Sequence, residues 1–222
     1  MYFAIHVPDA ERAKAFYATV FGWSYDSGGD YHHIRGSSPA GGIAGSGAAR
    51  VEPSFVVDDI RAAVATAKDN GGSAGEPVRS ESGWSARVED GRGGTVEVWQ
   101  PADGYRDPEP KCGIGDVFYF VLPVADDAAK DFYAALFGWE FTPGSHPGGW
   151  NIVGAVPAGG MFVGGAGTPS LYFQVDEVDA ARERVVAAGG TAGVKEPNSA
   201  GWHAACVDDQ GVEFAIGAVR ST

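Results

Sequence analysis

An eight-residue segment occurs twice in this chain of 222 residues. FYATVFGW, from Phe16 to Trp23, returns as FYAALFGW from Phe132 to Trp139. In each copy, apolar residues at helical spacing end at a glycine and strand-like sequence follows. The repeated segment therefore belongs to a supersecondary unit, and the chain must fold as copies of one design.

The first half of the chain predicts two successive modules, each made of a strand, a helix and three further strands. The first helix is expected between an N-cap at Asp9 and a stop at Gly22, and the second between Asp58 or Asp59 and the pair Gly71-Gly72. Short apolar runs between glycines and prolines give the strands. They are expected at 2–7, 23–26, 31–35, 42–44, 53–57, around Val78, at 84–89 and at 95–100.

The second half repeats this order. Phe132 follows Phe16 by 116 residues, and Asp176 follows Asp58 by 118 residues, so a two-residue insertion accounts for the change. The sequence predicts an α+β protein of four βαβββ modules in two tandem domains, 1–103 and 116–222, with a linker at 104–115. Paired modules of this kind, with short helices on a bent sheet, are expected to enclose a cavity.

Composition excludes several classes of partner. The formal net charge is −13 and Lys and Arg form no cluster, which disfavours nucleic acid, because binding to phosphates requires cations. The start of the chain lacks a basic segment followed by a long apolar run, and no later window resembles a membrane span. We expect a cytoplasmic protein with no membrane partner, in which Cys112 and Cys206 are free thiols.

This pattern resembles the vicinal oxygen chelate superfamily, which contains glyoxalases, bleomycin-resistance proteins and extradiol dioxygenases. The resemblance rests on the two Phe-Tyr-x-x-x-Phe-Gly-Trp segments and on two further repeated motifs. These are the helix starts Val-Asp-Asp at Val57 and Val-Asp-Glu at Val175, and the Asp-x-x-Gly turns at Asp90 and Asp208. The chain is similar to tandem glyoxalase-like proteins labelled hydroxylase or lactoylglutathione lyase-related, which implies two glyoxalase-like domains.

In metal-dependent members of that superfamily, His or Gln and Glu residues hold a divalent ion that chelates substrate oxygens. Carried over to this chain, the ligand positions fall on Tyr2 and Phe118, on Glu52 and Ser170, and on Glu97 and Ala215. The resemblance therefore implies an incomplete ligand set. We expect no cofactor, and Glu52 and Glu97 are the weak candidates for binding a divalent metal.

His6 and Glu97 are the candidate catalytic residues. His6 lies at the strand position where the superfamily's metal enzymes place a substrate-binding cation, and Glu97 is a candidate general base. Each residue also has a simpler interpretation. His6 could be a half-buried strand histidine, and Glu97 could be a carboxylate paired with a group on a neighbouring strand. The candidate binding residues, for which a filled core is the alternative, are Tyr2, His6, Trp84, Phe118, Phe120, Tyr172 and Gln174.

The sequence thus predicts a protein that acts on a small oxygen-rich or aromatic metabolite. As an enzyme it would be a lyase, isomerase or oxygenase relative and not a true glyoxalase I. The alternative is a non-catalytic binder that sequesters a small molecule, similar to bleomycin-resistance proteins. Either protein is expected as a monomeric pseudo-dimer or a homodimer.

Overall fold

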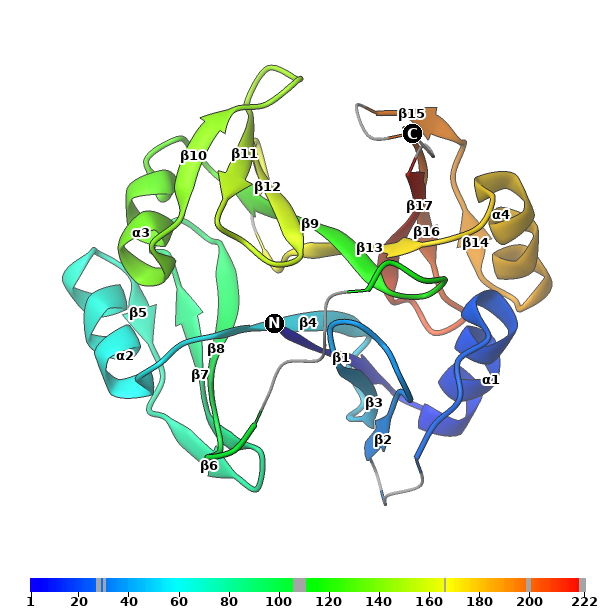
Figure 1. Cartoon of the computed structure of the whole chain (residues 1–222), viewed down its shortest axis with the longest axis horizontal. Coiled ribbons are helices and arrows are strands. Elements are labelled where there is room, and N and C mark those ends of the chain that lie inside the picture. The colour runs from blue at the N-terminus through cyan, green and yellow to red at the C-terminus, as the bar shows by residue number, and fades with distance from the viewer. Residues whose placement is uncertain (27–28, 30, 106–110, 166, 199–200, 220–222) are drawn as a thin grey trace. The chain divides into compact units, whose positions relative to one another are not determined.

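The computed structural model describes the chain except residues 27–28, 30, 106–110, 166, 199–200 and 220–222 (Figure 1). The helices are α1 (Ala10–Phe21), α2 (Ile60–Asp69), α3 (Ala129–Phe137) and α4 (Val178–Ala187). The first-half strands are β1 (Tyr2–Val7), β2 (Tyr31–His33), β3 (Gly41–Gly45), β4 (Arg50–Val56), β5 (Ser73–Ala74), β6 (Val78–Ser80), β7 (Gly83–Glu89) and β8 (Thr95–Pro101). The second-half strands are β9 (Val117–Val124), β10 (Glu140–Pro143), β11 (Gly149–Val153), β12 (Ala158–Val163), β13 (Ser170–Gln174), β14 (Thr191–Ala192), β15 (Glu196–Pro197), β16 (Gly201–Val207) and β17 (Glu213–Val219).

Both halves form mixed sheets, which confirms the predicted α+β class. Among the described residues, the strand orders are β2-β3-β1-β4-β8-β7-β5, with β6 on β7, and β10-β11-β12-β9-β13-β17-β16-β14, with β15 on β16. Within each module the first strand runs parallel to the last, as β1 with β3 and β4 with β8. The hairpin of β7 and β8 is antiparallel.

Helices α1 and α2 begin at their predicted N-caps. The side chain of Asp9 accepts a hydrogen bond from the backbone of Arg12, and of the two predicted aspartates it is Asp59 that caps α2. Gly22 ends α1 with a φ of 74°, a left-handed conformation that favours glycine. Where a strand is predicted at 23–26, the described residues make an isolated bridge between Tyr25 and Ile34. No helix in the described part of the chain is long and apolar enough to cross a membrane.

Residue contacts divide the chain into two compact units. The first unit consists of Met1–Tyr2, Glu52–Asp107 and Phe120–Pro169, and the second of Phe3–Val51, Pro108–Tyr119 and Ser170–Thr222. In Figure 1, α2 therefore lies beside α3 in the first unit, and α1 beside α4 in the second. Each unit combines modules from both halves of the sequence. The predicted domains 1–103 and 116–222 follow the halves instead, and that division stays a prediction.

The end of the predicted linker is ordered in the second unit. Residues 106–110 lie outside the described part of the chain. The buried carboxylate of Asp116 accepts hydrogen bonds from the backbone of Ser38 and of Gly113, each at 2.8 Å. Gly115 also donates a backbone hydrogen bond to Gln174 at 2.8 Å. These bonds tie residues 113–116 to both modules of that unit.

The repeated octamer forms the aromatic core of each unit. In the second unit, Phe21 and Trp23 pack on Phe173, with ring centroids 5.2 and 5.6 Å apart. In the first unit, Phe137 and Trp139 pack on Phe55, each at 5.3 Å. Aromatic rings at these separations contribute beyond the area they bury. The octamer therefore joins a helix of one module to a strand of its partner module.

The Asp-x-x-Gly turns meet the same octamers. The hydroxyl of the fully buried Tyr17 donates to Asp208 at 3.1 Å, and that of Tyr133 donates to Asp90 at 3.5 Å. Asp208 Oδ1 also accepts from the backbone of Gln210 and Val212, which closes the turn. Two motifs that are far apart in sequence are thus parts of one contact, repeated in each unit.

Strand β9 is shifted by one residue from its predicted alignment with β1. A methyl group added at Gly41 would lie 2.3 Å from the ring of Phe3, and one added at Gly159 would lie 2.3 Å from the ring of Phe120. Phe3 and Phe120 are therefore counterparts, 117 residues apart, and both are fully buried. Because side chains alternate between the faces of a strand, this shift exchanges the faces predicted for β9.

Candidate functional site

Glu97 lies at the centre of a polar strip in the first unit. Strand pairing places it opposite Ser54 on β4 and opposite Arg87 on β7. Alternation along β8 puts Thr95 and Trp99 on the same face as Glu97, whereas Val96 and Val98 point to the other face and are buried. We call the side of β4, β8 and β7 that carries these polar residues the Glu97 face.

Ser54 fixes the Glu97 carboxylate. The Ser54 hydroxyl donates to Glu97 Oε2 at 2.7 Å in a partly buried setting. No described residue donates a hydrogen bond to the second oxygen, Oε1. A hydrogen bond to a carboxylate is short and strong, and a held carboxylate loses little freedom when it meets a ligand. Oε1 is therefore available to accept a proton or a hydrogen bond.

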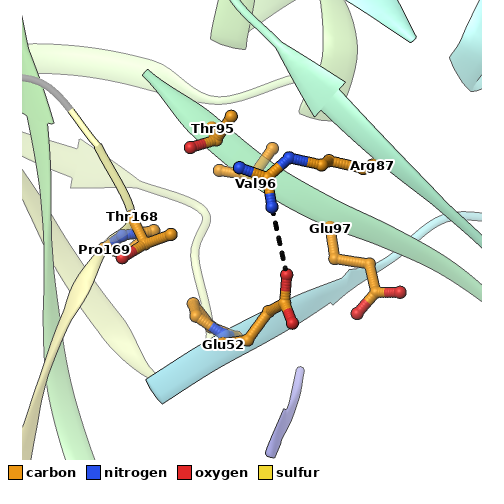
Figure 2. A pocket seen from close by; sticks show the side chains of 8 residues that line it. Glu52, Arg87, Thr95, Val96, Glu97, Thr168 and Pro169 are labelled. Carbon is orange, nitrogen blue, oxygen red and sulfur yellow. Dashed lines mark ion pairs between the residues drawn. The ribbon is translucent and has the colours of Figure 1, made fainter. Parts of the chain in front are cut away.

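A shallow pocket adjoins Glu97 (Figure 2). It is a depression that opens to solvent and encloses no cavity. The backbone of Thr95 donates to Gly167 at 2.9 Å, which brings the segment after β12 to the pocket wall. The lining residues are Glu52, Pro53, Arg87, Thr95, Val96, Glu97, Thr168 and Pro169.

Arg87 provides the positive charge of this pocket. Figure 2 shows its guanidinium facing Glu52, with 3.6 Å between Nη1 and Oε1. Arg87 is 54% exposed, so water screens the pair and its contribution to stability is small. Glu52 is 13% exposed and lines the pocket.

An aromatic group lies beyond Glu97 on the same face. The ring of Trp99 is 5.8 Å from that of Tyr2 and 4.8 Å from that of Tyr105. Trp99 is 7% exposed, and its indole Nε1 is buried without a hydrogen-bond partner among the described residues. Buried donors are nearly always paired, because leaving one unpaired costs about 1–3 kcal/mol. Trp99 Nε1 is thus an unsatisfied donor two residues from Glu97.

The donor set of this face does not fit a resident divalent ion. Such an ion needs several oxygen or nitrogen ligands around one point. In the part of the chain that the structure describes, no three His, Cys, Asp or Glu side chains gather in that way. Glu52 faces the Arg87 guanidinium and Glu97 holds Ser54. The expected absence of a cofactor still stays a prediction.

His6 belongs to the second unit. Its Nδ1 lies 3.0 Å from the hydroxyl of Ser46, and its side chain is partly exposed on β1. Glu97 belongs to the first unit, and so does Tyr2. The use of His6 and Glu97 as a catalytic pair stays a prediction.

A second aromatic cluster lies on β9, β13 and β16. The ring of Tyr172 is 5.9 Å from that of Tyr119, 5.9 Å from that of His203 and 6.4 Å from that of Phe118. Burial raises the pKa of both Tyr119 and Tyr172, so they remain neutral phenols at physiological pH. Gln174 shares the Tyr172 face by alternation, and its Oε1 lies 3.7 Å from the Cys112 thiol.

Two predicted binding residues lie elsewhere. Phe120 packs against Phe55 at 5.1 Å in the core of the first unit, so its grouping with Phe118 and Tyr172 is wrong. The one-residue shift of β9 is the physical reason. Trp84 alternates with Ser85 and Arg87, so it lies on the opposite side of β7 from the Glu97 face, where its ring meets the Arg79 guanidinium at 5.7 Å.

Sequence reasoning missed Ser54, Arg87 and Trp99. Trp99 could have been found from alternation, because it lies two residues after Glu97 in one strand. Arg87 could have been found by pairing β7 and β8 across the turn at Asp90. Ser54 depends on the register of β4 against β8, for which the sequence contains no signal.

Comparisons with known proteins agree on one fold. Residues 1–27 match the family described as bleomycin resistance protein-like N-terminal. The glyoxylase-named protein CFP32 of Mycobacterium bovis is 27% identical over 241 aligned residues, which cover 96% of this chain and 91% of that protein. The same values hold for CFP32 of Mycobacterium tuberculosis.

Solved structures extend the likeness to the whole chain. The Mn(II)-bound glyoxalase from Novosphingobium aromaticivorans has a TM-score of 0.67 and 18% identity, covering 97% of this chain and 80% of that one. The 2,2',3-trihydroxybiphenyl 1,2-dioxygenase from Sphingomonas wittichii has a TM-score of 0.66 and 16% identity, covering 98% and 89%. A catechol 2,3-dioxygenase has a TM-score of 0.63 and 15% identity, covering 100% and 88%. At these identities the likeness establishes the fold alone.

Proposed function

We propose that this chain, which has the fold of the vicinal oxygen chelate superfamily, binds a small oxygen-rich or aromatic metabolite on the Glu97 face and moves a proton of that ligand with Glu97. The observation that carries the proposal is the Ser54–Glu97 hydrogen bond of 2.7 Å. It holds one carboxylate oxygen of a residue that lines the pocket. The glyoxalase and dioxygenase folds among the structural neighbours support a small-molecule ligand.

The proton step requires only residues of this chain. In a ligand with a carbonyl group, Glu97 Oε1 removes a proton from the neighbouring carbon. The C–H bond breaks, the proton moves to Glu97, and the electron pair moves onto the carbonyl oxygen. A positioned carboxylate base accelerates such a step by about 10²–10⁴-fold. The second copy has Ala215 at the position of Glu97, as the pairing of Tyr172 with Ala215 shows, so the base occurs in one half.

The exchange of carbon-bound hydrogen tests this proposal. Dihydroxyacetone in D₂O is incubated with the protein, and loss of its CH₂ signal is followed by proton NMR. We expect Glu97→Gln, which keeps the shape and loses the base, to slow exchange by about 10²–10⁴-fold while binding changes little. Glu76→Gln is the matched control, because Glu76 is 93% exposed beside α2. Equal exchange by wild-type protein and E97Q would exclude Glu97 as the base.

A non-catalytic binder is the second candidate function. The cluster around Tyr172 favours it, because rings of Tyr119, Tyr172 and His203 gather where the equivalent of Glu97 is Ala215. The match of residues 1–27 to the bleomycin resistance protein-like family supports the same function. Saturable binding of an aromatic probe without any hydrogen exchange would favour the binder over the enzyme.

A further inference from the structure

Arg87 brings a cation to the pocket beside Glu97, and its hydrogen-bonding capacity is unused. A guanidinium carries five N–H donors in a planar fork. Its nitrogens lie 3.6 Å from Glu52 and 4.0 Å from Glu89, both longer than a hydrogen bond, and no described residue accepts a hydrogen bond from it. The side chain is 54% exposed and lines the pocket, so a ligand there can reach these donors.

Strand pairing places this side chain beside the proposed base. Arg87 and Glu97 lie directly opposite each other on the antiparallel strands β7 and β8. The Cβ atoms of such a pair are about 4.5–5.5 Å apart on one face of the sheet. The Arg87 guanidinium turns toward Glu52, and both Arg87 and Glu97 line the pocket (Figure 2). A small ligand in this pocket therefore meets a guanidinium and a carboxylate at once.

We propose that Arg87 binds the carbonyl oxygen and the adjacent hydroxyl oxygen of a hydroxyketone or hydroxyaldehyde, while Glu97 removes a proton from the hydroxyl-bearing carbon. This inference rests on the proposed function of Glu97. As the C–H bond breaks, the proton moves to Glu97 and the electron pair moves onto the carbonyl oxygen. A cation held at that oxygen stabilises the developing charge. Among the described residues that line the pocket, Arg87 is the one cation.

The two oxygens of the ligand match the shape of the guanidinium. Its fork presents parallel N–H groups, which can donate to two oxygens on adjacent carbons, whereas an ammonium group acts as a point charge. Glu52 and Glu97 place two carboxylates in the pocket against this one guanidinium. An additional carboxylate on the ligand would meet their repulsion. The arrangement therefore favours a neutral ligand.

The second half of the chain shows that the fold does not require Arg87. Ala205 pairs with Ala215 on β16 and β17, just as Arg87 pairs with Glu97 on β7 and β8. The same antiparallel hairpin thus forms with two small side chains in place of the guanidinium and the carboxylate. Because both groups are replaced together, the proposed chemistry is confined to one half.

Hydrogen exchange of dihydroxyacetone in D₂O, followed by proton NMR, tests the role of Arg87. We expect Arg87→Ala to slow exchange by about 10–100-fold, mainly through kcat, because the cation acts on charge that develops in the transition state. Arg87→Lys keeps the charge and loses the fork, so its rate should lie between those of wild type and R87A. Arg61→Ala, which removes an exposed arginine of α2, is the matched control and should exchange as wild type does.

Added guanidinium separates a chemical role of Arg87 from a structural one. The exposed position of this side chain lets a guanidinium ion from solution enter the space that R87A leaves. Guanidinium chloride at millimolar concentration should restore part of the exchange in R87A and none in E97Q. Sodium chloride at the same ionic strength should restore neither. Circular dichroism verifies that the variants are folded, and R87K provides the comparison if R87A is not.

The outcomes distinguish this inference from the proposed function. If E97Q stops exchange while R87A and R87K exchange as wild type does, Glu97 stands and the role of Arg87 is overturned. A slow R87A that guanidinium does not restore also overturns it, because the loss is then structural. Equal exchange by wild type and E97Q refutes the proposed function and this inference together. Tighter binding of hydroxypyruvate, which carries a carboxylate, than of dihydroxyacetone would overturn the preference for a neutral ligand.

Discussion

Replacing Tyr17 with Phe should destabilise this protein more than the same change at Tyr133. Both variants remove one hydroxyl from a buried ring that reaches an aspartate in the partner module. The hydrogen bond of Tyr17 to Asp208 is 3.1 Å long and that of Tyr133 to Asp90 is 3.5 Å, the outer limit for such a bond. The pair is a matched comparison, because the two contacts occupy equivalent places in the two units.

The magnitude follows from the charge of the acceptor. A hydrogen bond to a charged group contributes about 1.5–3 kcal/mol, whereas a long, poorly aligned one contributes about 0.5 kcal/mol. We therefore expect Tyr17→Phe to lower the free energy of unfolding by about 2 kcal/mol at pH 7, and Tyr133→Phe by less than about 1 kcal/mol. Urea unfolding followed by fluorescence and circular dichroism measures both.

The cost of Tyr17→Phe should depend on pH. Burial raises the pKa of Asp208, and the hydrogen bond from Tyr17 opposes that rise. As the pH falls through the raised pKa, the folded protein takes up a proton before the unfolded chain does, so Asp208 contributes stability in this window as the pH decreases. Protonation of Asp208 removes the charge-assisted bond in this pH range, so Tyr17→Phe should lower the free energy of unfolding by a smaller amount. An equal cost for the two variants at pH 7, or a cost of Tyr17→Phe that grows as the pH falls, would refute this reasoning.

Two further predictions concern packing and metal. Gly41→Ala and Gly159→Ala should each destabilise the protein by about 1–3 kcal/mol, because the added methyl groups would lie 2.3 Å from the rings of Phe3 and Phe120. Gly75→Ala is the control, because the nearest atom to its added methyl group would be 3.9 Å away, and it should be close to neutral. Urea unfolding measures all three variants. Elemental analysis of the purified protein should find no stoichiometric divalent ion, because no three acidic, His or Cys side chains of the described residues converge. For the same reason, adding Ni, Zn, Mn or Fe(II) should raise the melting temperature by less than about 2 °C. A stoichiometric ion would contradict the assignment of the donor set.

The repeat made most of the secondary structure predictable. The caps at Asp9 and Asp59, the stop at Gly22 and the apolar stripe through Phe16 and Tyr17 all follow from local chemistry, and the structure confirms them. The sequence also predicted correctly how β17 aligns with β8, because Glu97 and Ala215 occupy equivalent positions in the strand pairing. The match of a motif to its copy fixes such positions without any knowledge of the fold.

The first strand shows where this reasoning fails. The offset of 116 residues taken from the helices does not hold for β9, where Phe120 corresponds to Phe3. A strand alternates every residue, so an error of one position moves a side chain from the open face to the core. Phe120 was assigned to the binding residues for this reason, and Tyr119 was missed.

The sequence by itself determined the four modules, their helices and the aromatic residues that pack them. Only the tertiary structure decided which modules meet: the octamer of one half packs on a strand of the other, and Tyr17 reaches Asp208. It also decided that Ser54 holds Glu97 and that the Trp99 N–H has no partner among the described residues. Local motifs act over a few residues and leave their mark in the sequence. Contacts between strands depend on register and on which modules pair, and a single residue carries no signal of either.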